Sequence, residues 1–341
     1  MQDKSYNKQT QVDTYKLVKH IWIDLLKYLN FRIISFFMIN TTGDKSSEQM
    51  AEVVAPDADE QLLEWPMKDN RPFLRAVYRV SDLDRTIEFY TECFGMKLLR
   101  IRDVPEAKCT RAFMGFGSEQ SSFVLELNYS YGVTSYDIGA GFGHFAIASQ
   151  DVYKMVENVR VKGAGAGAVV RESFEVKGFS IVLAFVKDPD GYIFELIQRG
   201  PTPQPLCQVM LRVGDLERSI NFYEKALGMR VLTRIESLEH KYAIAMMGYA
   251  DELETTVLEL TYNHGVTQHS KGNGYSQVAI GTDKVNKSAE VLNLIIQELG
   301  GKITQQPSLV HQFKAKITTF LDPDGWQIVL VDNEDYLKGL H

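Results

Sequence analysis

The chain has 341 residues, which is enough for two or three domains with buried cores. An apolar share of 45% and a charged share of 24% are ordinary for a soluble globular protein. A net charge of −7 without a Lys/Arg run argues against a nucleic-acid partner. The three cysteines (Cys93, Cys109 and Cys207) are odd in number and lack metal-ligand spacing, so they indicate free thiols in a reducing compartment.

Residues 1–70 form an extension that differs from the rest of the chain. Its apolar stretch, residues 15–40, is interrupted by charges such as Lys19 and Asp24, which argues against stable membrane insertion or a signal peptide. Two interpretations stay open: a poorly ordered or helical extension without a folded role, and a membrane-surface anchor. Residues 41–60 are typical of a linker, and Met50 could serve as an alternative start. We expect a cytoplasmic protein, with the plastid as the alternative address.

A regular pattern of strands and helices begins near residue 73. A helix is predicted over residues 83–94, with Asp82 as its N-cap and Gly95 as its terminator. A second helix is predicted over residues 152–162, before the glycine-rich residues 163–167. The strands predicted around these helices are residues 74–80, 97–102, 110–116, 122–129, 143–149, 181–186 and 192–198.

The same order of elements recurs after a Pro-rich linker at residues 200–206. Residues 79–90 match residues 212–223 at an offset of 133. The turn sequence Asp-Pro-Asp-Gly at 188–191 recurs at 322–325, an offset of 134, so one indel lies between. A long period with a matching element order indicates two duplicated α+β domains, residues 71–199 and 207–335, each holding two strand–helix–strands units.

One carboxylate stands inside each of two apolar strand candidates. Glu126 lies in the strand that begins at residue 124, and Glu259 lies in its near copy, which begins 133 residues later. Burial of a lone carboxylate costs several kcal/mol unless a cation or a strong hydrogen-bond donor accompanies it. His144, Glu195 and Gln208 also stand in apolar strands. A single His or Gln there is usually a core residue, but the four polar groups Glu259, His144, Glu195 and Gln208 in a duplicated fold favour a metal site.

Several motifs resemble those of glyoxalase I (lactoylglutathione lyase), and the two-domain form typical of plants is the most similar. The resemblance covers roughly residues 61–340, and the motifs that carry it are residues 77–85, 89–96, 141–145 and 188–192. It implies the vicinal-oxygen-chelate fold, in which βαβββ modules pair and each pair builds a metal site. It also implies isomerisation of the hemithioacetal of methylglyoxal and glutathione to S-lactoylglutathione.

The resemblance implies one complete site. Its metal ligands are Gln208, Glu259, His144 and Glu195, with Glu195 as the catalytic base and Glu259 as the opposite catalytic carboxylate. The implied cofactor is one divalent ion, with Ni2+ favoured and Zn2+ or Co2+ as alternatives. The glutathione-binding residues would be Arg212, Asn263 and Lys177. Because both halves are fused, a monomer could build this site.

The complementary site would be degenerate. Its four positions hold Arg75, Glu126, Gln277 and Val329. Arg75 is a cation where a ligand should stand, and Val329 has no donor atom. We therefore expect an ion pair between Arg75 and Glu126 in place of a metal ion.

There are two alternatives to the function that the resemblance implies. An extradiol dioxygenase of the same fold needs two His and one carboxylate on Fe(II), and neither set of four residues offers two His. A non-catalytic or inactive glyoxalase-fold binding protein remains the alternative, given the departure at Arg75.

Overall fold

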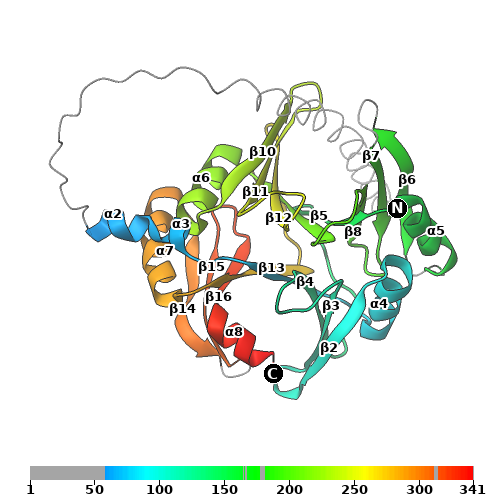
Figure 1. Ribbon diagram of the computed structural model, residues 1–341, viewed down its shortest axis with the longest axis horizontal. Coiled ribbons are helices and arrows are strands. Elements are labelled where there is room, and N and C mark those ends of the chain that lie inside the picture. The colour runs from blue at the N-terminus through cyan, green and yellow to red at the C-terminus, as the bar shows by residue number, and fades with distance from the viewer. Residues whose placement is uncertain (1–57, 164, 166, 177–180, 311–313, 341) are drawn as a thin grey trace, which may run out of the picture.

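The computed structural model describes residues 58–340 except 164, 166, 177–180 and 311–313 (Figure 1). Helices α2 (Ala58–Leu63) and α3 (Trp65–Lys68) precede four βαβββ modules. The first module comprises β1 (Phe73–Arg79), α4 (Leu83–Phe89) with a π-helix (Tyr90–Phe94), β2 (Lys97–Val104), a 3-10 turn (Pro105–Ala107), β3 (Cys109–Gly115) and β4 (Val124–Ser130). The second comprises β5 (Phe142–Ser149), α5 (Val152–Val161), β6 (Ala168–Val176), β7 (Ile181–Lys187) and β8 (Ile193–Gln198).

The second half of the chain repeats this order. The third module comprises β9 (Leu206–Val213), α6 (Leu216–Leu227), β10 (Arg230–Ser237), β11 (Tyr242–Gly248) and β12 (Val257–Asn263). The fourth comprises β13 (Tyr275–Thr282), α7 (Val285–Leu299), β14 (Lys302–Val310), β15 (Ala315–Leu321) and β16 (Gln327–Asp332), and helix α8 (Asn333–Gly339) follows it. The predicted α+β class with tandem modules is confirmed.

The helix ends follow the sequence signals. The side chain of Asp82 accepts a hydrogen bond from the backbone N of Arg85 at 3.0 Å, which caps the first turn of α4. Asp215 caps α6 in the same way. Gly95 closes the π-helix with φ of 75°, a left-handed conformation that glycine adopts without strain.

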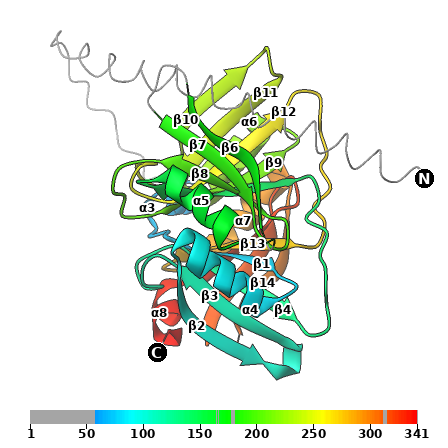
Figure 2. The same cartoon turned by 90° about the vertical axis from the view of Figure 1, so that its right-hand side faces the viewer.

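The modules pair across the two halves of the chain. Sheet A joins the first and fourth modules in the order β14-β15-β16-β13-β1-β4-β3-β2, and sheet B joins the third and second in the order β10-β11-β12-β9-β5-β8-β7-β6. The seams are antiparallel pairings of β1 with β13 and of β5 with β9. Figures 1 and 2 show sheet B above sheet A.

The main core lies between the sheets and the four long helices. Helices α6 and α7 lie at one side of the molecule, and α4 and α5 lie at the other (Figures 1 and 2). Alternate side chains of each strand enter this core, and the others form smaller apolar clusters on the opposite face of each sheet. The helices thus leave those opposite faces available for the polar groups.

Two features go beyond the sequence prediction. Strand β6 follows the glycine-rich residues, although no strand was predicted there. The end of the predicted extension is helical and docked: the indole Nε1 of Trp65 donates to Ser288 Oγ on α7 at 3.1 Å, and Pro66 is buried. The interpretations of residues 15–40, of the linker up to residue 57 and of Met50 concern residues outside the described part. Among the described helices, none has the length and apolarity to cross a membrane.

Candidate metal centre

The four predicted donors stand on neighbouring strands of sheet B. Strands β12, β9, β5 and β8 lie side by side and carry Glu259, Gln208, His144 and Glu195, respectively. Ala146 is paired with both Gln208 and Glu195, so these side chains share one face of the sheet. His144 stands two residues before Ala146 and therefore points to the same face. The topology thus brings two residues from each half of the chain together.

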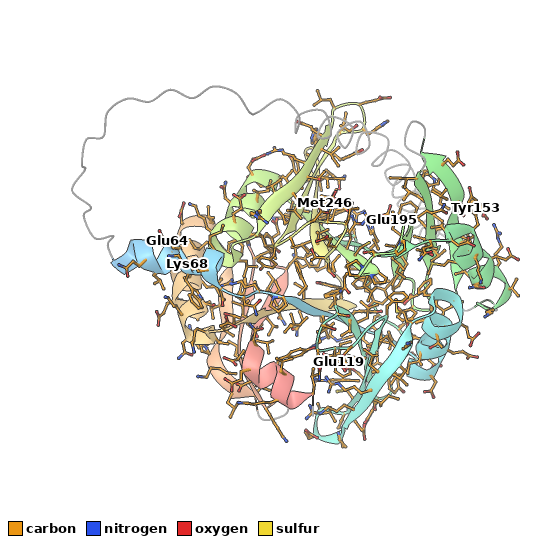
Figure 3. All side chains as sticks on the ribbon, in the orientation of Figure 1. Glu64, Lys68, Glu119, Tyr153, Glu195 and Met246 are labelled. Atoms are coloured by element: carbon orange, nitrogen blue, oxygen red, sulfur yellow. The ribbon has the colours of Figure 1, made fainter. Side chains whose placement is uncertain are left out.

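The donor atoms are close to one another and buried. One ligand atom from each of His144, Glu195 and Glu259 lies within 4.8 Å of the others. His144 Nε2 is 3.3 Å from Glu195 Oε2 and 3.5 Å from Glu259 Oε2. Glu195 and Glu259 have no exposed surface, and Gln208 is 3% exposed. Figure 3 places Glu195 in sheet B, in the same region as Met246.

The group fits a divalent metal ion. His144 Nε2, both carboxylate oxygens of Glu195, Glu259 Oε2 and Gln208 Oε1 are buried without a hydrogen-bond partner. Buried polar atoms in native proteins are almost always bonded, so five such atoms on one face of the sheet indicate a site for a cation. A nitrogen donor with carboxylate and amide oxygens suits zinc, nickel or cobalt.

The electrostatics of the group depend on that cation. Burial lowers the pKa of His144, but its contacts with Glu195 and Glu259 outweigh burial and raise this pKa to about 9. Burial raises the pKa of Glu195. A proton on His144 and a bound metal ion are therefore alternative ways to balance two carboxylates in a dry site.

Neighbouring side chains hold the donors in place. Thr261 Oγ1 donates to Glu259 Oε1 at 3.1 Å, and Gln208 Nε2 donates to Met246 Sδ at 3.7 Å. The ring of Phe185 meets His144 edge-on, with 6.2 Å between ring centroids. Sequence analysis missed Met246 and Phe185 because a buried apolar side chain in a strand carries no signal of its own.

The predicted glutathione-binding residues have different surroundings. Arg212 is buried, and its Nη1 donates to the carbonyl oxygens of Ala140 at 2.8 Å and Phe142 at 3.2 Å. Burial lowers the pKa of Arg212. Asn263 ends β12 and is half-buried, and Lys177 lies outside the described residues.

Arg212 also lines a cavity of about 560 Å³. Arg218, His269, Lys271 and Trp326 line it as well. Sequence analysis did not single out these four. Residues 264–274 have neither strand nor helix periodicity, so only the folded chain brings His269 and Lys271 to Arg212.

The degenerate set lies at the matching place on sheet A. Arg75 Nε is 2.7 Å from Glu126 Oε2, and Arg111 Nη1 is 3.5 Å from Glu126 Oε1. Gln277 Oε1 accepts a hydrogen bond from Gln327, and Val329 is buried. The ion pair expected between Arg75 and Glu126 is present, so the chain itself balances this carboxylate.

Paired βαβββ modules that bring donors from two halves of a chain to one sheet define a class of fold. The sequence model of the protein family described as the Glyoxalase/Bleomycin resistance protein/Dioxygenase superfamily matches residues 73–196 and 206–330. The chain belongs to this superfamily.

The similar proteins show which members of this superfamily the chain resembles. A lactoylglutathione lyase of Arabidopsis thaliana is 68% identical over 279 residues, which cover 82% of this chain and 98% of that protein. A lactoylglutathione lyase of Oryza sativa subsp. japonica is 64% identical, covering 84% and 98%. A probable chloroplastic lactoylglutathione lyase of Arabidopsis thaliana is 58% identical, covering 89% and 83%. The crystal structure of glyoxalase I from Zea mays superposes with a TM-score of 0.79 at 64% identity, covering 82% and 98%.

Proposed function

We propose that this chain is a lactoylglutathione lyase, an enzyme that isomerises the hemithioacetal of methylglyoxal and glutathione to S-lactoylglutathione. The observation that carries the proposal is the buried donor set of Gln208, Glu259, His144 and Glu195 on sheet B, which includes five buried atoms without a hydrogen-bond partner. The lactoylglutathione lyases that are 64–68% identical over at least 82% of the chain support it.

The reaction moves a proton between two neighbouring carbons of the substrate. Gln208, Glu259, His144 and Glu195 would hold one divalent ion, which supplies Lewis-acid stabilisation for the negative charge that develops on the two substrate oxygens. Glu195 would take the proton from C1 and return it at C2. Burial raises the pKa of this carboxyl, which favours its uptake of a proton.

The other residues would position the groups and the substrate. Glu259 is the opposite carboxylate, oriented by its hydrogen bond from Thr261. Arg212 and Asn263, with Lys177, would bind the glutathione part. The cations Arg218 and Lys271 in the cavity beside Arg212 suit the carboxylates of a tripeptide.

The metal is proposed to be Ni2+, with Zn2+ and Co2+ as alternatives. Chelator-treated protein should lose turnover, and the ion that restores the highest rate identifies the cofactor. The assay follows the ultraviolet absorbance of the thioester that forms from methylglyoxal and glutathione.

Matched carboxylate variants test the assignment of the site. Glu195→Gln should lower kcat by roughly 10²–10⁴-fold, the usual contribution of a general base. Glu126→Gln changes the buried carboxylate of the degenerate set on sheet A and should leave turnover almost unaltered. Comparable losses in both variants would refute the assignment. A protein that binds S-lactoylglutathione but never forms it would instead be the non-catalytic binding protein.

Two further properties belong to the proposal. A single chain supplies all four donors, so a monomer is proposed, and light scattering on the purified protein tests it. A cytoplasmic location is proposed from the cysteine count, although one relative is named chloroplastic. Imaging of the full chain with a C-terminal fluorescent tag distinguishes the two addresses.

A further inference from the structure

Sheet A carries a basic cavity where the degenerate set stands. The cavity has a volume of about 420 Å³ and is lined by five arginines: Arg75, Arg79, Arg100, Arg102 and Arg111. Among the described residues that line it, Glu126 is the single carboxylate. This concentration of positive charge stands out in a chain whose net charge is −7.

The repeat shows that the charge is not inherited from a common pattern. At the offset of 133, the five arginines correspond to Gln208, Arg212, Thr233, Ile235 and Ile244. Four arginines therefore stand where the metal-centre half has uncharged side chains. The site on sheet A differs from its twin both by the loss of metal donors and by a gain of four guanidinium groups.

Three of these arginines contact carboxylates of the described residues. Glu126 lies between Arg75 and Arg111, and Glu119 accepts two hydrogen bonds from Arg100, at 2.7 and 2.9 Å. Several guanidinium groups that share one partly enclosed cavity favour the binding of an anion there. The planar fork of arginine matches the oxygens of carboxylate and phosphate groups.

The C-terminal helix supplies one wall of the cavity. Tyr336 and Leu340 line it, and the Tyr336 hydroxyl donates to the carbonyl oxygen of Glu119 at 3.1 Å. The Arg75 guanidinium lies 5.6 Å from the centre of the Tyr336 ring. Glu119 lies in the turn between β3 and β4, and Figure 3 shows it near α8. The cavity is therefore a built, partly enclosed space with an aromatic wall.

We propose that this cavity is a non-catalytic binding site for a small organic anion that carries two or more carboxylate or phosphate groups. The volume suits a small metabolite. The arginines bind the charged groups, while Val329 and Ile317 contact the carbon skeleton. The site is separate from the metal centre, so the inference does not depend on the proposed lyase activity.

Calorimetric titration of the metal-loaded protein tests the proposal. The probes are tricarballylate with three carboxylates, fructose 1,6-bisphosphate with two phosphates, and acetate as a singly charged control. At least one polyanion should bind with one-to-one stoichiometry and more weakly at high salt, whereas acetate should not bind measurably. The polyanion that binds more tightly identifies carboxylate or phosphate as the preferred group.

Variants locate the binding site. The double variant Arg102→Ile with Arg111→Ile introduces the residues that the other half holds at these positions. It should weaken polyanion binding at least tenfold, while lyase turnover stays intact. Arg160→Gln removes one positive charge on the exposed side of α5, which matches the single variant Arg102→Ile, and should leave binding unchanged. Glu259→Gln at the metal centre should also leave binding unchanged.

Three outcomes would overturn the inference. They are no saturable binding of either polyanion at millimolar concentration, unaltered affinity in the double variant, and loss of binding in Glu259→Gln. If the double variant does not fold, Arg102→Ile alone, at a half-buried position, still has to weaken binding severalfold.

Discussion

His144 lies between two buried carboxylates, and its protonation competes with metal binding. With a pKa of about 9, the imidazole holds a proton at neutral pH in metal-free protein. A metal ion needs the neutral ring, so binding must release this proton. The same carboxylates that attract the ion thus also set a pH-dependent cost for loading it.

We predict that metal affinity rises with pH up to about pH 9, by at most tenfold per pH unit for this one proton. Titrations in buffers of different ionisation enthalpy measure the number of protons released. His269→Gln, which changes a histidine of the neighbouring cavity, should leave that number unaltered. Metal binding at neutral pH without proton release would contradict the prediction.

Gly143, which precedes His144, leaves room for the Met210 side chain. A Cβ atom at residue 143 would stand 1.7 Å from Met210 Sδ, and Met210 is buried on the adjacent strand β9. Gly143→Ala should therefore displace the Met210 side chain and weaken metal binding. The double variant Gly143→Ala with Met210→Ala removes the clash and should recover much of the affinity. Metal titration of both variants checks this, and equal affinities in the two would contradict it.

At the scale of elements, the two Asp-Pro-Asp-Gly turns make the same hydrogen bonds in each half of the chain. Asp188 accepts hydrogen bonds from the backbone N of Asp190 and of Tyr192 and from the hydroxyl of Tyr90. Asp322 makes the same three contacts, with Tyr223 as the hydroxyl donor. Each turn therefore connects its strands to the helical segment of the preceding module.

These buried aspartates predict a pH-dependent stability. Burial raises the pKa of both Asp188 and Asp322 to about 7 from the usual 3.8. The folded protein then keeps protons that the unfolded chain loses near pH 4, so these groups make the free energy of unfolding fall as pH rises from about 4 to about 7.

Asp188→Asn should flatten part of that fall, because the amide has no proton to lose. Urea unfolding across this pH range measures the effect. Asp151→Asn, at the exposed N-cap of α5, is the control and should keep the parental pH profile. Parallel curves for parent and Asp188→Asn would contradict the prediction.

The elements show which parts of the structure were predictable. Caps such as Asp82 and Gly95 and the duplicated turns depend on local chemistry, so the sequence located them closely. Strand β6 was missed because it follows a glycine-rich stretch. The partners of each strand came only from the family resemblance, since pairing is non-local. The basic cavity was not predictable, because Arg100, Arg102 and Arg111 are ordinary strand residues in the sequence, and only the folded chain brings them to one cavity with Tyr336 of α8.

At the scale of the whole molecule, neither half of the chain contains a complete sheet. The proposed metal centre takes His144 and Glu195 from one half and Gln208 and Glu259 from the other, and the seams β1–β13 and β5–β9 hold the halves together. Two seams through two separate sheets should keep the halves associated even without a covalent link.

We predict that cleavage at a protease site inserted in the linker at residues 200–205 leaves one particle that still binds metal. Size-exclusion chromatography and metal analysis of the cut protein measure both properties. Residues 207–341 produced alone should bind metal much more weakly, since two donors are absent. Separation of the fragments after cleavage in native buffer would contradict the prediction.

The order of modules along the chain also has a consequence during synthesis. Sheet B uses the second and third modules, which are consecutive, so all its strands have left the ribosome once residue 263 emerges. Sheet A joins the first and last modules and must wait for the C-terminus. The nascent polypeptide can therefore assemble its metal centre before the basic cavity exists, with the first module left waiting for its distant partner.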